Sequence, residues 1–195
     1  MTRRYRKSSL TALVPAGLVL LAGILILTGC GTTSRDIQTL DPYTPDPQVI
    51  VNPASVRLGV AKLMDTTIEF QGSGFEPGDS VFVTLSGNEI PEFAVADAPV
   101  LDDGTFRTTA GALGKITGML RATISGTYAK DGSYKQYIVI TEPPLPEGIY
   151  TVTATSMLSD RSAGTELQVR RPGTMDRIKD WMGKKLGKIK DERPR

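Results

Sequence analysis

Short stretches of alternating apolar and polar residues, separated by turn-forming clusters, run through the middle of the chain. One stretch places apolar side chains at every second position, at Val81, Val83 and Leu85. Clusters rich in Gly, Pro and Asp, such as residues 76–79 and 130–133, separate these stretches. Short strands with such frequent turns favour a β-sandwich. We therefore expect a mainly β domain over residues 49–170, beginning with an edge strand that Pro53 interrupts.

Three segments of this region resemble bacterial immunoglobulin-like domains. Residues 70–81 (FQGSGFEPGDSV) match a glycine-rich connection and hairpin of that family, in which Phe75 would close one end of the sandwich. Residues 104–106 (GTF) and 146–154 (PEGIYTVTA) match a turn and the strand before the last one. The resemblance covers about residues 52–170 and implies a single immunoglobulin-like β-sandwich. It implies no activity, because this fold carries many unrelated functions.

The alternation stops between residues 110 and 122. Leu113, Ile116 and Leu120 recur there at helical spacing, which predicts a short helical insertion that caps the open end of the sandwich. The strand pattern returns over residues 123–128 and 134–141, around a turn at residues 130–133. We expect these two strands to form a hairpin.

The first 30 residues follow a different pattern. Four cations and no acidic residue precede an uncharged apolar run over residues 10–27, which small residues and the only cysteine follow. A basic start, an apolar run and a small-residue end are typical of a secretory signal. The run stands at the lower limit for spanning a bilayer, and Pro15, Gly17 and Gly23 weaken it as a helix. These features favour a cleaved signal over an uncleaved transmembrane helix.

Leu27-Thr28-Gly29-Cys30 resembles the lipobox of bacterial lipoproteins. The resemblance implies cleavage between Gly29 and Cys30, a diacylglyceryl thioether on Cys30, and usually a further N-acyl chain such as palmitate. Two or more acyl chains make a stable membrane anchor. Gly31 stands where an aspartate marks inner-membrane retention in enterobacterial lipoproteins. The resemblance therefore favours the outer membrane and leaves open whether the domain faces the periplasm or the cell surface.

The rest of the chain divides by charge. Residues 30–169 contain 9 Lys and Arg against 17 Asp and Glu, whereas residues 170–195 contain 10 against 4. Nucleic-acid binding needs a basic face, so the acidic body argues against a nucleic-acid partner. Residues 30–48 are rich in Pro, Asp and Thr, which predicts a disordered tether between residues 1–29, the signal peptide, and the folded domain.

Residues 171–195 predict a basic amphipathic helix with Thr174 as its N-cap and Asp176 in its first turn. Trp181 stands beside apolar residues at three- and four-residue spacing: Met175, Ile178, Met182, Leu186 and Ile189. Three interpretations remain open: a solvated tail packed weakly on the acidic domain, a contact with anionic lipid, or docking to an acidic partner. In the last two, we assign the contact to Trp181, Lys184, Lys185 and Lys188.

The chain lacks the residues that several common catalytic mechanisms require. It has no histidine, and its one cysteine is the predicted lipidation site, which excludes a histidine-based triad, a cysteine nucleophile and a His/Cys zinc site. We expect no metal and no cofactor. Asp97, Asp102, Asp103 and Asp131 are interpreted as turn residues rather than a carboxylate pair or a calcium site.

Three tyrosines, Tyr128, Tyr134 and Tyr137, belong to the predicted hairpin. We interpret them as residues of the sheet face and core rather than an exposed strip for sugar or peptide.

Taken together, these features predict a non-catalytic, lipid-anchored envelope or surface lipoprotein. We expect it to bind or scaffold an envelope protein or glycan that the sequence does not identify. Two alternatives remain: a structural spacer subunit of a secretion or adhesion assembly, and a carboxylate-dependent hydrolase.

Overall fold

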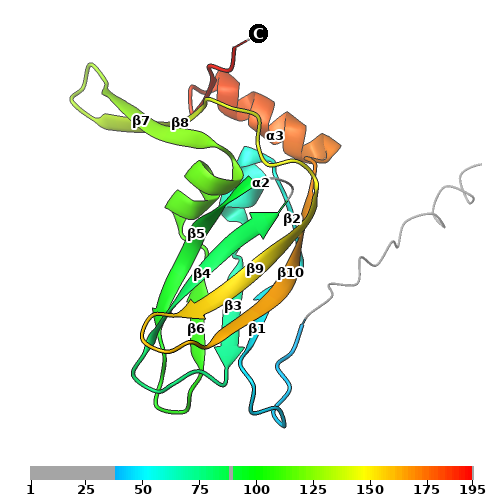
Figure 1. The fold of residues 1–195 in the computed structure, drawn as a ribbon. Helices are drawn as coiled ribbons and strands as arrows, with labels where there is room; N and C mark the ends of the chain where they lie inside the picture. The colour runs from blue at the N-terminus through cyan, green and yellow to red at the C-terminus, as the bar shows by residue number, and fades with distance from the viewer. Residues whose placement is uncertain (1–37, 88–89, 195) are drawn as a thin grey trace, which may run out of the picture. The chain divides into compact units, whose positions relative to one another are not determined.

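The computed structural model of the 195-residue chain describes residues 38–87 and 90–194. These residues belong to one compact unit, Arg35–Arg195, and form mainly β-strands with three helices (Figure 1). The predicted mainly β fold is confirmed. The predicted signal peptide, with Gly29 and Cys30, lies outside the described residues.

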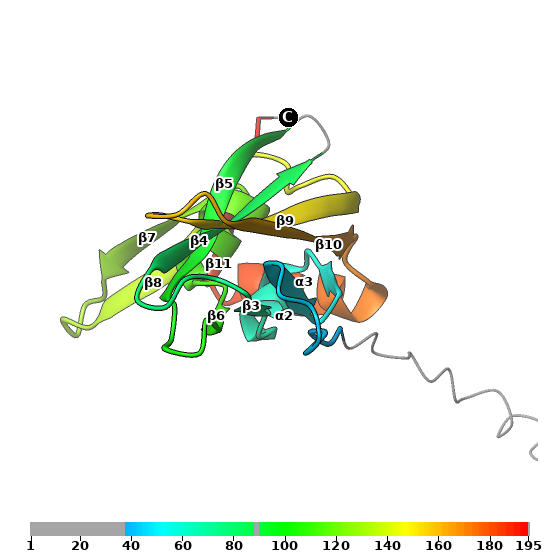
Figure 2. The ribbon, with the colours of Figure 1, turned by 60° about the horizontal axis from the view of Figure 1, so that its bottom comes forward.

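Two sheets build the main core. Sheet A has the strand order β1-β3-β6, with bounds Gln48–Asn52, Glu69–Ser73 and Phe106–Thr109. Sheet B has the order β2-β10-β9-β4-β5, with bounds Ser55–Arg57, Ser162–Arg170, Gly148–Ser156, Ser80–Gly87 and Ile90–Pro99. Within these sheets only β2 and β10 pair in parallel. Figure 2 shows β4, β9 and β10 on one side and β3 and β6 on the other, an arrangement compatible with a β-sandwich.

Alternation along the strands places apolar side chains between the sheets. In β4, Val81, Val83 and Leu85 are buried, and the residues between them are more exposed, as the sequence predicts. Aromatic rings from β3, β6 and β9 fill the centre of the core, at Phe70, Phe106 and Tyr150. Phe75 is also buried and packs edge-on against Phe106, with ring centroids 5.3 Å apart.

The start of the domain differs from the predicted single edge strand. Asn52-Pro53 separates β1, in sheet A, from β2, in sheet B, so the chain changes sheets there. Residues Val60–Asp65 then form helix α2, which the sequence pattern did not predict. Its two core-facing residues, Val60 and Leu63, are spaced for a helix, but the segment is too short for periodicity to identify.

Strand β5 is longer than predicted. The sequence indicated short strands at residues 93–95 and 100–101, whereas one strand runs from Ile90 to Pro99. Its alternation is weak because a register shift against β4 occurs between Val83 and Thr84.

Between β6 and β9 the chain forms a helix and a hairpin. The π-helix η1, Gly114–Met119, lies inside the predicted insertion and buries Ile116 and Met119. Strands β7, Ala122–Tyr128, and β8, Tyr134–Ile140, pair antiparallel, which confirms the predicted hairpin. Strand β11, Ile189–Asp191, joins β8 in parallel and completes sheet C, in the order β11-β8-β7.

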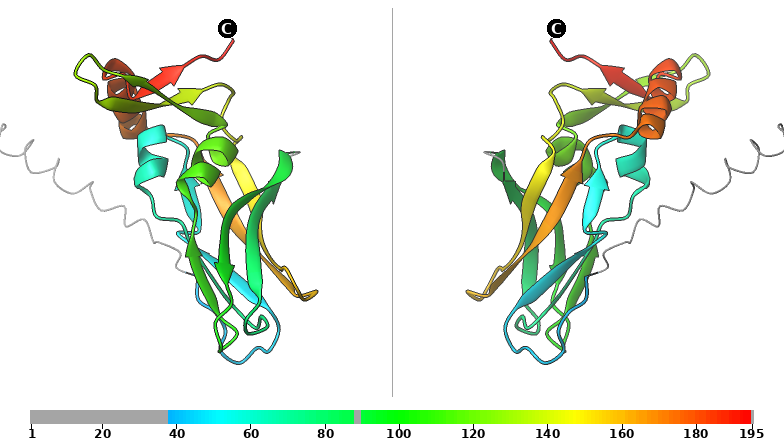
Figure 3. Two further views of the ribbon diagram at one scale, coloured as in Figure 1. Left: turned by 90° about the vertical axis from the view of Figure 1, so that its left-hand side faces the viewer. Right: turned by 90° about the vertical axis from the view of Figure 1, so that its right-hand side faces the viewer.

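The helices and sheet C gather at one end of sheets A and B (Figure 3). They include α3, Thr174–Lys185, which packs beside α2. The turn between β9 and β10 lies at the opposite end. This arrangement brings the C-terminal tail, the hairpin and α2 together, although they are far apart in the sequence.

The described part of the predicted tether, residues 38–48, is attached to the domain. The side-chain oxygen of Gln38 accepts hydrogen bonds from the Val51 amide, at 3.0 Å, and from the Thr165 hydroxyl, at 3.1 Å. The Gln38 amide in turn donates to the Asn52 side chain at 3.1 Å. The prediction of a disordered tether is therefore wrong for this part, because the side chains of Gln38 and Asn52 accept hydrogen bonds from backbone amides at the edge of the sheet.

Candidate docking surface

Helix α3 begins one residue earlier than the predicted cap implies. Its N-cap is Gly173, and Thr174 is the first helical residue. The Gly173 amide donates a hydrogen bond of 2.9 Å to a carboxylate oxygen of Asp176. Asp176 therefore satisfies a backbone group that the helix leaves without a partner, as an acid in the first turn is suited to do.

Helix α3 ends at Lys185, with Leu186 as its C-cap and Gly187 next to it, rather than continuing to the end of the chain. Gly187 has a φ of +70°, the Lys188 amide bonds to the Gly183 carbonyl, and the Gly187 amide bonds to the Lys184 carbonyl. These two bonds and the left-handed glycine form a Schellman motif, which terminates a helix. The predicted helix over residues 171–195 is therefore too long, since residues 189–191 form β11 instead.

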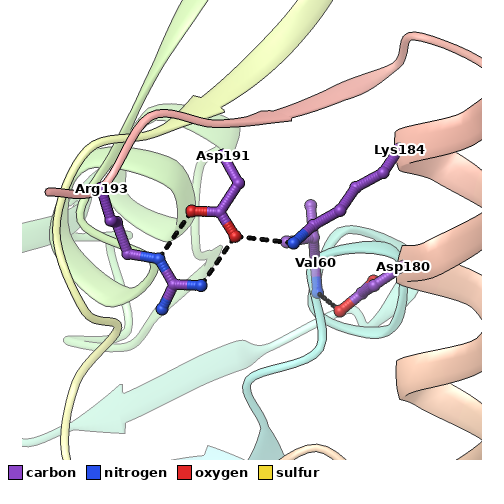
Figure 4. A network of polar contacts seen from close by, with 5 residues as sticks. All are labelled: Val60, Asp180, Lys184, Asp191 and Arg193. Carbon is purple, nitrogen blue, oxygen red and sulfur yellow. Dashed lines mark hydrogen bonds and ion pairs between the residues drawn. The ribbon is translucent and has the colours of Figure 1, made fainter. Parts of the chain in front are cut away.

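The acidic residues of α3 face the domain. One carboxylate oxygen of Asp180 accepts a hydrogen bond of 3.0 Å from the Val60 amide (Figure 4). The other oxygen accepts one of 3.0 Å from the Ala61 amide. These amides belong to the first turn of α2, where an amide has no partner within its own helix. A charged acceptor makes such hydrogen bonds stronger than neutral ones. Asp180 thus bonds α3 directly to α2.

Asp176 and Gly59 form a second contact between α3 and the rest of the domain. Asp176 is only 6% exposed, and its carboxylate lies 3.9 Å from the guanidinium of Arg57. A Cβ atom at Gly59 would lie 2.8 Å from the Cβ of Asp176, which is too close for van der Waals contact. Glycine at position 59 therefore permits the close approach of α3 at this point.

Beyond the helix, Asp191 connects β11 to α3. Lys184 donates to one Asp191 oxygen at 2.6 Å, and Arg193 donates to both oxygens at 2.7 Å (Figure 4). The hydrogen bonds from Arg193 and then from Lys184 hold the pKa of Asp191 well below its usual range. Lys184 is one of the predicted contact residues, and it is bonded within the tail.

The apolar residues of α3 face solvent. Five large side chains of the helix and its cap are between 47% and 70% exposed: Met175, Ile178, Trp181, Met182 and Leu186. Successive helical residues turn by about 100°, which places these five within an arc of about 140°. Asp176, Asp180 and Gly183 lie on the opposite side of the helix. We call the five exposed apolar residues, with the exposed cations Arg177, Lys179 and Lys185, the outer face of α3.

The remaining predicted contact residues are on or near this face. The Lys185 ammonium lies over the Trp181 ring, 5.9 Å from its centroid. Lys188 is exposed, while its backbone carbonyl accepts the Ile138 amide at 3.0 Å and so helps to fix the tail on the hairpin. The structure therefore brings Trp181 and Lys185 together, with Lys188 just beyond the helix end.

The hairpin tyrosines divide into two environments. Tyr128 and Tyr134 are 76% and 54% exposed near the turn, and their ring centroids are 5.1 Å apart. Tyr137 is half-buried under the Lys190 ammonium, which lies 3.9 Å from its ring centroid. The interpretation as sheet-face residues fits Tyr137, whereas Tyr128 and Tyr134 form a small exposed pair.

Three of the four acidic residues considered for chemistry, Asp102, Asp103 and Asp131, lie in turns as predicted. The prediction is wrong for Asp97, which lies within β5 and pairs with Phe82 of β4. Asp103 accepts hydrogen bonds from the amide and hydroxyl of Thr105, and Asp131 accepts the same pair from Ser133. Over residues 38–87 and 90–194, no three His, Cys, Asp or Glu side chains are grouped to hold a metal ion.

Lys115 is buried, bonds to the Thr66 carbonyl at 2.6 Å, and has its pKa lowered by burial.

Sequence reasoning overlooked the two acids that orient α3. It treated Asp176 only as a partner for the helix dipole and did not single out Asp180. Asp176, Asp180 and Gly183 recur at spacings of four and three, which places two acids and a glycine on one side of the helix. The position of both acids on one side of a basic helix was therefore a signal in the sequence that this side contacts backbone amides of the domain.

No protein-family model matches the chain, and no curated protein is detectably similar to it. None of the helices formed by the described residues combines the length and apolar character needed to cross a bilayer.

Proposed function

We propose that the chain is a bacterial lipoprotein, held in the cell envelope by lipid on Cys30. Its folded part is a non-catalytic module that binds or scaffolds an envelope component. The Leu27–Cys30 motif supports the anchor, and Gly31 after it favours the outer membrane. The outer face of α3 is the observation that supports a binding role, because a contiguous exposed apolar surface is typical of an interaction site.

We further propose that the domain is immunoglobulin-like. Strands β1, β3 and β6 face the set β2-β10-β9-β4-β5. In this set β9 lies between β10 and β4, as the middle strand of the C-F-G sheet does in sandwiches of that family. The hydroxyl of Tyr150, near the start of β9, donates to the Pro146 carbonyl at 3.0 Å. This contact has the form of the tyrosine corner of such domains and supports the assignment. The helix and hairpin between β6 and β9 are then an insertion in one connection of the sandwich.

The anchor is tested by intact mass and membrane partition in a bacterial host. We expect the wild-type chain to begin at Cys30, to carry a lipid-sized mass and to fractionate with membranes. The matched variant Cys30→Ala should carry no lipid and should escape cleavage after Gly29. A wild-type chain that keeps residues 1–29 and carries no lipid would exclude the lipoprotein and the outer-membrane location together.

A further inference from the structure

We propose that the outer face of α3 docks on an anionic lipid surface. The inference deepens the proposed function and rests on it, since lipid on Cys30 would keep this face near a membrane. The face itself lies within residues 174–188, and contacts with α2 and Gly173 orient it.

The pattern of side chains on this face matches a membrane–water interface. The apolar arc is bounded by Arg177 on one side and by Lys179 on the other. Cations on both borders can pair with anionic head groups while the apolar arc enters the acyl boundary. Five exposed apolar residues on a single helix form the kind of contiguous apolar surface that marks an interaction site.

Trp181 and Lys185 are placed as interfacial residues. Trp181 stands at the edge of the apolar arc nearest Arg177, and the Lys185 ammonium lies over its ring. Tryptophan prefers the boundary between acyl chains and head groups, where its ring is buried and its N–H stays near water. Lys185 can lay its alkyl chain along the apolar arc and keep its ammonium at the head groups.

The helix already holds this orientation before it meets a membrane. Asp180 bonds to α2, Asp176 bonds to Gly173, and the Schellman motif at Gly187 fixes the other end. A face that is formed in advance loses less conformational entropy on binding than a tail that must fold on contact. The occupied inner side also leaves only the apolar and basic side available for docking.

The charges of the outer face suit an anionic membrane. The acids of α3 are turned inward, while Arg177 and Lys179 are exposed at the borders of the apolar arc and Lys185 is exposed within it. The body of the chain is acidic, so this face is a local basic surface on an otherwise negative domain. The charge complement of such a surface is a layer of anionic head groups.

The test uses the mature chain without lipid, residues 30–195 with Cys30→Ser, which contains the complete compact unit. Vesicles of phosphatidylglycerol mixed with phosphatidylcholine are compared with vesicles of phosphatidylcholine alone. Binding is followed by co-sedimentation and by the emission of Trp181, which is the only tryptophan in the chain. We expect binding to the anionic vesicles with a blue shift of the emission, and little binding to the neutral ones.

Two variants of the face and two controls make the test specific. Ile178→Ser with Met182→Ser removes apolar area, and Arg177→Glu with Lys185→Glu reverses charge. All four positions are exposed, so the core is left intact. Each double variant should weaken vesicle binding by about tenfold or more. The matched controls are Leu158→Ser, at an exposed apolar residue near the β9–β10 turn, and Lys130→Glu, at the hairpin turn, and both should bind as the parent does.

Four results would overturn the inference. They are no binding to anionic vesicles, equal binding to neutral vesicles, an equal loss in the control variants, or a dimer that the Ile178→Ser and Met182→Ser double variant dissociates. The last would assign the face to a second copy of the chain. Because this chain has no lipid, the outcome is independent of the anchor. If the wild type is lipidated but the unlipidated mature chain does not bind anionic vesicles, the docking proposal alone is refuted. If the unlipidated mature chain binds these vesicles but the wild type carries no lipid on Cys30, the anchor alone is refuted.

Discussion

Asp79 connects two turns that lie far apart in the sequence. It is buried, and its carboxylate accepts hydrogen bonds from the Ser80 amide at 2.6 Å, the Leu158 amide at 3.2 Å and the Ser159 hydroxyl at 3.2 Å. Burial raises the pKa of Asp79, but the hydrogen bonds, with Ser80 first among them, outweigh burial and leave the pKa below its usual range. The ionised carboxylate is therefore the form that the fold stabilises.

The variant Asp79→Asn should be less stable than the wild type at neutral pH, because the amide group is a weaker acceptor and adds a donor. A carboxyl whose folded pKa is lowered contributes stability above its unfolded pKa and loses it as pH falls through the folded value. Thermal unfolding of both proteins should therefore show a gap at neutral pH that narrows below about pH 4. A gap that stays constant down to strongly acidic pH would show that Asp79 acts without its charge.

Gly72 is a position where the backbone itself must approach a neighbour. A Cβ atom at this residue would lie 2.8 Å from the Gln48 carbonyl oxygen and closer still to the Phe106 ring. Gly72→Ala should therefore lower the free energy of unfolding in urea by about 1–3 kcal/mol, as overpacking of a filled core does. The matched control is Gly111→Ala, where nothing lies within 4 Å. An equal effect at both positions would contradict the packing argument.

At the scale of single elements, the C-terminal tail shows what a periodic pattern can and cannot predict. The spacing of apolar residues predicted a helix correctly, but it assigned Leu186 and Ile189 to the same helix face. Gly187 separates them, so Leu186 ends the helix at 70% exposure while Ile189 enters β11 at 6% exposure. A glycine within a helical pattern, here Gly187, is therefore the signal that stops the helix.

Ile189 and Leu186 make a matched pair for a stability measurement. Ile189 packs against Gly183 and belongs to the hydrophobic core, so Ile189→Ala should cost about 2–4 kcal/mol in urea unfolding. Leu186→Ala removes an exposed side chain and should change stability by less than about 0.5 kcal/mol. Equal and small losses for both variants would mean that β11 does not add to the folded domain.

At the scale of the whole molecule, the sequence predicted the strands of sheets A and B better than their surroundings. Val81, Val83 and Leu85 alternate clearly because one side of β4 is buried and the other is not. The β7–β8 hairpin of sheet C was predicted, but the addition of β11 was beyond such reasoning, since its pairing with β8 joins residues that are about 50 positions apart. The contact of Asp180 with α2 was equally hidden, because it joins residues 120 positions apart.

The central claim is that Asp180 binds α3 to α2, so that the apolar and basic face of α3 is turned outward. Amide hydrogen exchange at Val60 and Ala61 tests this claim most directly. Amides in the first turn of a helix have no partner within it and exchange quickly, unless another group accepts their hydrogens. We predict slow exchange at both amides in the wild type and fast exchange in Asp180→Ala. Fast exchange in the wild type, or slow exchange that survives in the variant, would contradict the docked orientation of α3.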